Sequence, residues 1–275
     1  DKGVVKKTTV GERKLVGFGI SKPSFTLANP DDLDAQAHAE ALSEENAYYV
    51  YEYELPDGVL MTYDEEEIEA SETVSFQSAN LTFNVSYSSG TPTAAKTATA
   101  YALKIWSSAL SGTVPVTLSI TFKDLGDGIL GCSYSPGAGL VNGVYYPESI
   151  LSQKKGVDCS PNFDIRLEFN TKYSWYYGTD KNPGSYVDFV TIVLHEVCHG
   201  LGFYDSIISS SGGYGYGSGS YPLIYDTLLY YNGSRFTNLS ASSRKKAIVS
   251  NALYFDGSNA KSANGGSRIK LFAPS

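Results

Sequence analysis

The sequence lacks a long hydrophobic run. Over 275 residues, no stretch approaches the roughly 18 consecutive apolar residues that a membrane-spanning helix needs. The first residues, DKGVVKKTTV, also lack the apolar centre of a signal peptide. We therefore expect no membrane span. Because the chain starts at Asp1 rather than Met, we also expect a processed or partial protein, with truncation at the C-terminus an open alternative.

Basic residues are scarce relative to acidic ones. The chain has 21 Lys and Arg against 29 Asp and Glu, which gives a formal net charge of −8. A phosphate backbone would be repelled by such a chain on average, which argues against nucleic acid as a partner. The composition, 42% hydrophobic and 18% charged, is that of a globular protein with a sizeable core.

Cysteine and methionine are rare, with three and one copies. Cys132 and Cys159 lie in a Gly-rich region where a disulfide between them is predicted, whereas Cys198 lies in an apolar helical pattern and should remain reduced. Four Asn-x-Ser/Thr sequons are compatible with secretion; they begin at Asn80, Asn84, Asn232 and Asn238. We expect a secreted or cell-surface protein.

The chain divides by composition into two parts. Residues 1–72 are rich in acidic clusters and predict one helix over 31–45 and two strands, YYVYEYEL and GVLMTYD, joined by a Pro-Asp-Gly turn. We interpret this part as a pro-segment or appendage that restrains the site. Residues 73–275 form the second part, which we interpret as the catalytic domain.

Periodicity in the second part predicts an α+β fold. Apolar residues alternate with polar ones over 81–87, 116–122 and 165–169, which is typical of half-buried strands. Helical spacing over 93–110 and 189–201 predicts a backing helix and a second helix. Residues 125–143 and the Ser/Gly/Tyr run 209–221 are expected to be loops. The expected fold is a twisted mixed sheet with these two helices.

The most informative segment is DFVTIVLHEVCHGLGFYD, residues 188–205. Its apolar residues gather on one side of the predicted helix, and His195 and His199, at i and i+4, lie together on the opposite side. Two imidazoles at this spacing can bind one tetrahedral zinc ion, and Glu196 is placed to take a proton from metal-bound water. The segment therefore predicts a zinc site, although such patterns also occur by chance on polar helices.

HEVCHGLGF followed by Asp205, and preceded by IRLEFN, resembles the metzincin-type zinc metallopeptidases and their snapalysin-like members. Over about residues 78–275 the chain is similar to a group of secreted bacterial proteins described as zinc metallopeptidases. The resemblance implies a metzincin-like fold, zinc on His195 and His199, and Glu196 as general base. It also implies a turn at Gly202 and Asp205 as third ligand. The metzincin methionine turn is missing, because the only methionine is Met61.

The third ligand stays open on the residues alone. After His199 the chain contains no His and no Glu, which leaves Asp205, Asp226 and Asp256. Asp205 ranks first because a turn at Gly202 would bring it back to the metal. A ligand beyond Ser275 and His38 are the remaining alternatives.

The expected function is hydrolysis of peptide bonds in a protein or peptide substrate by a zinc-dependent endopeptidase. The strand at 165–169 is expected to align an extended substrate by backbone pairing. The alternatives are a binding or adhesion module on a degenerate zinc-peptidase scaffold, and hydrolysis of some other bond. Tyr204 and Tyr225 are candidates for polarising a substrate carbonyl, with packing as the simpler role for both.

Overall fold

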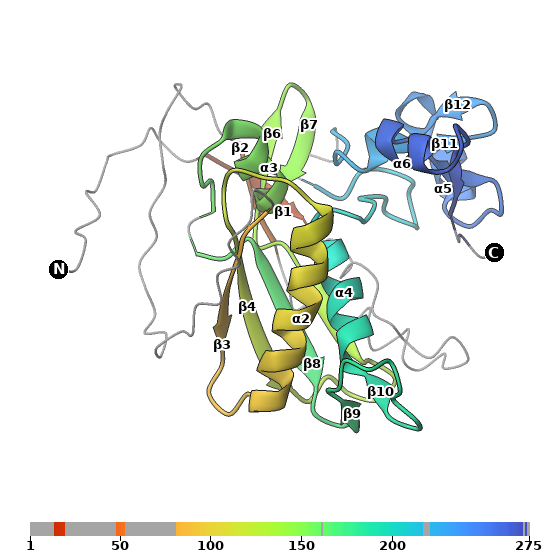
Figure 1. Ribbon diagram of the computed structural model, residues 1–275. Coiled ribbons are helices and arrows are strands. Elements are labelled where there is room, and N and C mark those ends of the chain that lie inside the picture. The colour runs from red at the N-terminus through yellow and green to blue at the C-terminus, as the bar shows by residue number, and fades with distance from the viewer. Residues whose placement is uncertain are drawn as a thin grey trace.

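The structure, a computed structural model, describes residues 14–19, 48–52, 81–160, 162–216, 221–271 and 273 (Figure 1). It is a mixed α+β protein, as predicted. The central sheet has the order β3-β4-β8-β5, in which three strands are parallel and the last is antiparallel. These strands are β3 (Phe83–Tyr87), β4 (Val116–Lys123), β8 (Ile165–Asn170) and β5 (Gly131–Tyr134).

Two helices, α2 (Thr93–Ala109) and α4 (Phe189–Gly200), lie side by side against this sheet (Figure 1). The alternating apolar residues of β3, β4 and β8 are buried beneath them and form the main hydrophobic core. The Trp106 indole N–H of α2 donates to the Leu194 carbonyl of α4 at 3.2 Å. The three predicted strands and both predicted helices are confirmed, because amphipathic periodicity directly encodes burial on one face.

The strand at 165–169, which was expected to align an extended substrate by backbone pairing, does not lie at an edge of the sheet. Strand β8 is interior, flanked by β4 and β5. Its neighbour β5 is an edge strand with the sequence GCSY. These residues do not alternate apolar with polar, and the sequence analysis therefore predicted a loop here. Within the described residues, the edge strand next to β8 is β5, so an extended substrate would pair with β5 rather than with β8.

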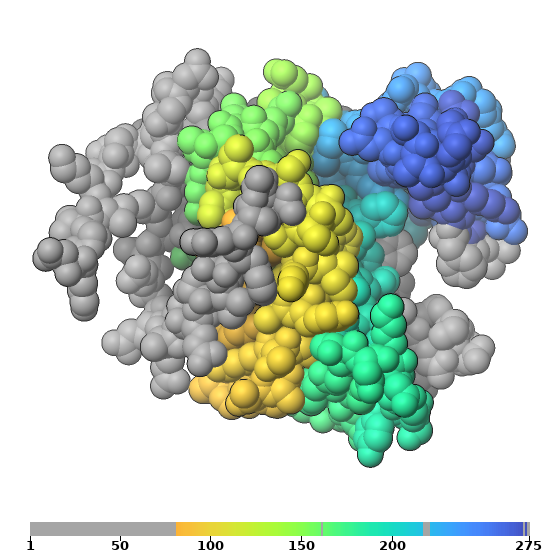
Figure 2. Space-filling view, in the orientation of Figure 1, coloured from red at the N-terminus to blue at the C-terminus, as the bar shows by residue number. Residues whose placement is uncertain are grey.

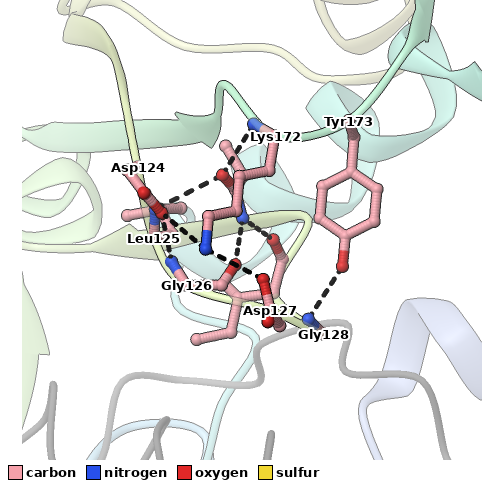
Figure 3. A network of polar contacts seen from close by, with 9 residues as sticks. Asp124, Leu125, Gly126, Asp127, Gly128, Lys172 and Tyr173 are labelled. Atoms are coloured by element: carbon pink, nitrogen blue, oxygen red, sulfur yellow. Dashed lines mark hydrogen bonds and ion pairs between the residues drawn. The ribbon is translucent and has the colours of Figure 1, made fainter.

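The loop that returns from β4 to β5 is fixed by one buried amide, that of Asn170 (Figure 3). The Asn170 side-chain N–H group donates to the carbonyls of Gly126 and Ile129 at 2.6 and 2.7 Å. Its oxygen accepts the N–H groups of Leu125 and Lys172. Nearby, Lys172 pairs with Asp124 and Asp127, and the Tyr173 hydroxyl accepts the Gly128 N–H. The network holds β5 in place against α4.

A second sheet has the order β1-β2-β6-β7. It contains β1 (Lys14–Gly19), β2 (Tyr48–Glu52), β6 (Ala138–Val141) and β7 (Val144–Pro147), and helix α3 (Glu148–Lys155) follows directly. Strand β2 coincides with the start of the predicted strand YYVYEYEL and pairs with β6 through Tyr51 and Gly139. The predicted helix over 31–45 and the strand GVLMTYD lie outside the described residues.

The C-terminal part forms a third sheet in the order β12-β11-β13-β14. Its strands are β11 (Leu229–Tyr231), β12 (Ser234–Arg235), β13 (Leu253–Phe255) and β14 (Ile269–Lys270), accompanied by α5 (Ala241–Ala247) and α6 (Ser258–Ala263). The remaining elements are the pair β9 (Trp175–Tyr176) and β10 (Val187–Asp188) and the 3-10 turns Asp226–Leu228 and Phe236–Asn238. None of these short elements was predicted, because two or three residues carry no periodicity.

The predicted disulfide is also absent: Cys132, Cys159 and Cys198 are all free thiols. The Cys132 thiol is buried in β5 and donates to Glu168 at 3.4 Å, whereas Cys159 follows α3 and contacts the Val157 carbonyl. A Gly-rich composition had suggested one loop that brings the two together, but strands β6 and β7 and helix α3 lie between them in the chain. Among the described residues, no helix combines the length and apolar character of a bilayer-spanning segment.

Candidate metal centre

The site is built on α4, which begins after Asp188 and ends at Gly200. Asp188 occupies the N-cap position, where its carboxylate accepts the Thr191 hydroxyl at 2.5 Å. At the other end, Gly200 lies so close to β8 that a Cβ atom there would come within 2.3 Å of the Ile165 side chain. Glycine at this position lets the helix approach the sheet.

Helix α4 ends in a Schellman motif. The Gly202 N–H donates to the His199 carbonyl at 2.8 Å, and the Phe203 N–H donates to the Cys198 carbonyl at 3.2 Å. Gly202 has φ of 91°, a left-handed conformation that favours glycine. The predicted turn at Gly202 is therefore present.

The reversal of the chain at Gly202 brings the Phe203 carbonyl back to His199. The His199 Nδ1 lies 2.8 Å from that carbonyl oxygen. Because a carbonyl only accepts, Nδ1 carries the proton and donates, which leaves Nε2 with its lone pair. This is the backbone contact that orients metal-binding histidines in proteins.

The two imidazoles of the motif converge. The Nε2 atoms of His195 and His199 are 2.9 Å apart, with the rings nearly perpendicular. Burial lowers the pKa of His199 to about 4, with the nearby His195 adding to the decrease, so His199 is neutral at neutral pH. The sequence placed both histidines away from the apolar stripe. Both side chains are less exposed than that position implied: His199 is buried and His195 is half-buried.

Glu196 is the most unusual group of the helix. Its side chain is fully buried, at 0% exposure, and neither carboxylate oxygen has a hydrogen-bond partner among the described residues. Burial raises its pKa well above the ordinary value of 4.5. The Glu196 charge also contributes to raising the pKa of the Cys132 thiol in strand β5. A buried carboxyl without partners is costly to the fold, and such groups are retained where chemistry uses them.

The structure places the three candidate aspartates differently. The Asp205 carboxylate accepts the Ile207 N–H at 2.8 Å, which forms a local turn just after the Phe203 carbonyl. Asp226 is fully buried and accepts the Ser206 N–H, the Ser206 hydroxyl and the Leu223 N–H. Asp256 pairs with Lys261 and Arg268.

No three His, Cys, Asp or Glu side chains in the described part of the chain are grouped as a complete metal site. The structure therefore brings the His195 and His199 side chains together, and Glu196 follows His195 on the same helix. It does not bring Asp205, Asp226 or Asp256 into one group with both histidines. His38 lies outside the described residues.

Aromatic residues around Phe203 were missed by sequence reasoning as parts of the site. The Phe203 ring packs on Tyr225 and Phe255, at centroid distances of 4.8 and 5.8 Å. This cluster anchors the residue whose carbonyl orients His199. Tyr225 is thus a packing residue, as is Tyr204, whose hydroxyl is 2.8 Å from that of Tyr216. The only sequence signal was the aromatic residue immediately after a helix-ending glycine.

An apolar pocket of about 400 Å³ opens on the flank of α4. It is lined by Trp106 of α2, by Leu110 just after that helix, by Ile150 of α3, and by Cys198 and Phe203. None of His195, Glu196 and His199 lines this pocket. Burial in this apolar setting raises the pKa of the Cys198 thiol to about 11, which favours the protonated, packed thiol.

The sequence model of the SPBPB7E8-like family matches residues 62–228. The chain belongs to the SPBPB7E8-like family. The matched region contains the two histidines, Glu196, Asp205 and Asp226, and it ends before β11. A search of curated proteins and a search of solved structures found no match.

In this SPBPB7E8-like chain, the donor set fits a zinc ion at two positions. Neutral imidazole is a preferred zinc ligand, and the two Nε2 atoms lie 2.9 Å apart. The unpartnered buried carboxylate of Glu196 is a further indication of an ion or reactant beside it. The described residues do not include a third ligand grouped with both histidines.

Proposed function

We propose that the chain is a secreted, zinc-dependent endopeptidase with a metzincin-like catalytic domain. His195 and His199 would hold the metal, and Asp205 is the proposed third ligand. The observation that carries the proposal is the pair of Nε2 atoms 2.9 Å apart, with the His199 Nδ1 bonded to the Phe203 carbonyl. That contact fixes the tautomer that a metal ligand needs.

A bound Zn²⁺ supplies a Lewis acid, which acidifies water and polarises a carbonyl group. Glu196 acts as the general base, and burial raises its pKa, which makes its carboxylate a stronger base than an exposed one. The carboxylate accepts a proton from the attacking water and passes it to the departing amine. Strand β5, the edge of the central sheet beside α4, is the proposed surface for an extended peptide.

Glu196→Gln separates catalysis from metal binding. The amide keeps the shape of the side chain but cannot accept the proton, so hydrolysis of casein should fall by about 10²- to 10⁴-fold. Zinc content, measured by atomic absorption, should be unchanged. Asp158→Asn, which neutralises an exposed carboxyl beyond α3, is the control and should keep full activity.

The competing function is a binding or adhesion module on the same scaffold. It predicts bound zinc without cleavage of casein or any other unfolded protein by the parent chain. If the parent chain cleaves casein and Glu196→Gln does so at the same rate, the assignment of Glu196 is refuted.

A further inference from the structure

Basic residues are concentrated at the C-terminal end of this acidic chain. Of the 21 Lys and Arg and 29 Asp and Glu in the chain, residues 229–275 contain seven basic residues and a single acidic one, Asp256. This part of the chain contains the sheet β12-β11-β13-β14. In Figure 2 it is the blue lobe at the upper right. A protein with a net charge of −8 thus carries a locally cationic lobe.

The strand register places several of these charges on one face of the sheet. Tyr230 lies opposite both Arg235 and Tyr254, and Tyr254 lies opposite Lys270. Directly opposite residues share a face, so these four side chains form a row across all four strands. Arg268, two residues before Lys270, belongs to the same face. We call Tyr230, Arg235, Tyr254, Arg268 and Lys270 the cationic face.

The cationic face points away from the core. Residues of the opposite face, among them Leu229, Leu253 and Phe255, pack into the second hydrophobic core. Arg235, Arg268 and Lys270 are exposed, whereas the two tyrosines are half-buried. The charges are therefore accessible to a partner.

The face already shows how it receives a carboxylate. The Asp256 side chain, only 5% exposed, lies 2.8 Å from the Arg268 Nε and 3.0 Å from the Lys261 Nζ, with an Arg235 nitrogen at 3.9 Å. The Arg268 guanidinium is held by stacking over the Tyr230 ring at 3.5 Å. One carboxylate among three cations, with Lys270 beside them, leaves positive charge unbalanced.

We propose that the cationic face binds an acidic segment of a polypeptide, and that proteins with such segments are the substrate class. The second half of this proposal rests on the proposed peptidase function. A long polyanion would extend beyond the lobe onto the acidic remainder of the chain, whereas a short acidic peptide segment would not. In the described part of the chain β14 is also an outer strand, and only a polypeptide can pair with its backbone.

The sheet that carries the cationic face contacts the candidate metal centre through its opposite face. Phe255, next to Asp256, contacts Phe203, whose carbonyl is bonded to His199. A segment bound to the C-terminal sheet would therefore tether the rest of its chain near the end of α4. Such tethering raises the local concentration of substrate and lowers KM without changing kcat.

The binding test uses the full chain and a fluorescently labelled oligoglutamate peptide, with oligoglutamine as the neutral comparison. Oligoglutamate should bind, and the double variant Arg235→Gln/Lys270→Gln should weaken binding by about tenfold, since each exposed charge pair contributes modestly. Added salt should also weaken it. The matched control, Lys154→Gln/Lys155→Gln, removes two exposed cations of α3 and should bind like the parent.

Equal binding of oligoglutamate by the parent and the Arg235→Gln/Lys270→Gln variant would overturn the proposal. So would tighter binding of a single-stranded oligonucleotide or a sulfated oligosaccharide at the same salt concentration. These measurements involve no catalysis. The binding result can therefore be interpreted even if the proposed peptidase function is wrong.

The substrate test compares two peptides with one cleavage sequence and either an oligoglutamate or an oligoglutamine tail. The acidic tail should lower KM with kcat unchanged, and Arg235→Gln/Lys270→Gln should abolish that difference while cleaving the neutral-tailed peptide normally. Cleavage of both peptides with the same KM would refute the substrate class alone. Cleavage of neither, with oligoglutamate still bound, would refute the proposed function and leave the binding face intact.

Discussion

Each ring nitrogen of His199 has a defined neighbour. Nδ1 is bonded to the Phe203 carbonyl, and Nε2 faces the Nε2 atom of His195. A histidine buried only for packing needs one hydrogen bond, and neither its second nitrogen nor a second imidazole would have to be aligned. This arrangement supports the proposed role of the two histidines as zinc ligands.

Asp205 can be tested as a ligand separately from its role in the turn. Its carboxylate accepts the Ile207 N–H, and an asparagine can do the same with its amide oxygen. Asp205→Asn should therefore preserve thermal stability, yet weaken zinc binding by more than the 10- to 100-fold that is typical of losing an outer-shell partner. Competition with a chromophoric chelator measures the affinity.

Asp256→Asn is the control for Asp205→Asn. It also removes a carboxylate downstream of His199 but one that is paired with Lys261 and Arg268. It should leave zinc affinity unchanged, even if stability falls. If Asp205→Asn binds zinc as tightly as the parent chain, Asp205 is not the third ligand, and Asp226, His38 or a residue beyond Ser275 takes its place.

At the scale of the element, the Schellman turn couples the end of α4 to the orientation of His199. Gly202→Ala forces a left-handed conformation on alanine, at a cost of about 1–2 kcal/mol. Space is not the problem, because the added Cβ would lie 3.4 Å from Pro147, an ordinary contact. We expect this variant to lose that much unfolding free energy and to bind zinc at least about tenfold more weakly, as the Phe203 carbonyl shifts.

Gly156→Ala is matched to Gly202→Ala. Gly156 ends α3 with φ of 70°, and nothing lies within 4 Å of its added Cβ. Urea unfolding should show a similar loss of stability, whereas zinc affinity should not change. Equal zinc affinity in the two variants would mean that the turn at Gly202 does not position His199.

The loop after α4 is anchored by Asp226, whose titration should be visible in stability. Burial, with the nearby Asp205 adding to it, raises the pKa of Asp226 from 3.8 to about 7. Between about pH 4 and pH 7 the folded chain keeps a proton that the unfolded chain has lost. The free energy of unfolding should therefore fall as pH rises through this window, by up to about 4 kcal/mol, and level off above it.

Asp226→Asn isolates this contribution, because an amide does not titrate. Burial also raises the pKa of Asp164 to about 6. Asp164 therefore lowers the stability with rising pH in the parent chain and in Asp226→Asn alike. The comparison is thus the difference between the two pH profiles, measured by urea unfolding from pH 4 to pH 8. A constant difference across that range would show that Asp226 titrates near its ordinary value in the folded chain.

Periodicity in the sequence predicted the helices and strands that bury one face and expose the other. It did not predict elements without that pattern. Strands β3, β4 and β8 and helices α2 and α4 all have apolar residues at their own period. By contrast, β5 has the sequence GCSY, which has no such period. Its place at the sheet edge depends on the loop before it, which is held by the side chain of Asn170, 44 residues after Gly126 and 41 after Ile129. No local pattern encodes a partner at that separation.

The same division applies to the candidate site. The spacing of His195 and His199 placed both on one side of a helix, since four residues make about one turn. The Phe203 carbonyl could not be found this way, because its role depends on the turn at Gly202 and on packing against Phe255. Side chains are visible in a sequence, whereas the backbone groups that orient them are not.

At the scale of the whole molecule, the candidate centre lies where three parts of the fold meet. Helix α4 supplies the histidines, strand β5 packs against α4, and the C-terminal sheet contacts Phe203 through Phe255. An ion bound at this junction would stabilise all three against unfolding together. Zinc should therefore affect the global stability of the chain rather than a single loop.

Zinc binding should raise the melting temperature of the full chain. At a free zinc concentration about 100-fold above Kd, binding to the folded state contributes about 2.7 kcal/mol. For a chain of this length that corresponds to a shift of roughly 5–10 °C, which scanning calorimetry with zinc or with a chelator can measure. His199→Ala should abolish the shift. His38→Ala, which removes the one histidine outside the motif, should keep it. A shift that survives His199→Ala would place the zinc elsewhere, and one that disappears in His38→Ala would make the N-terminal segment a contributor to the site.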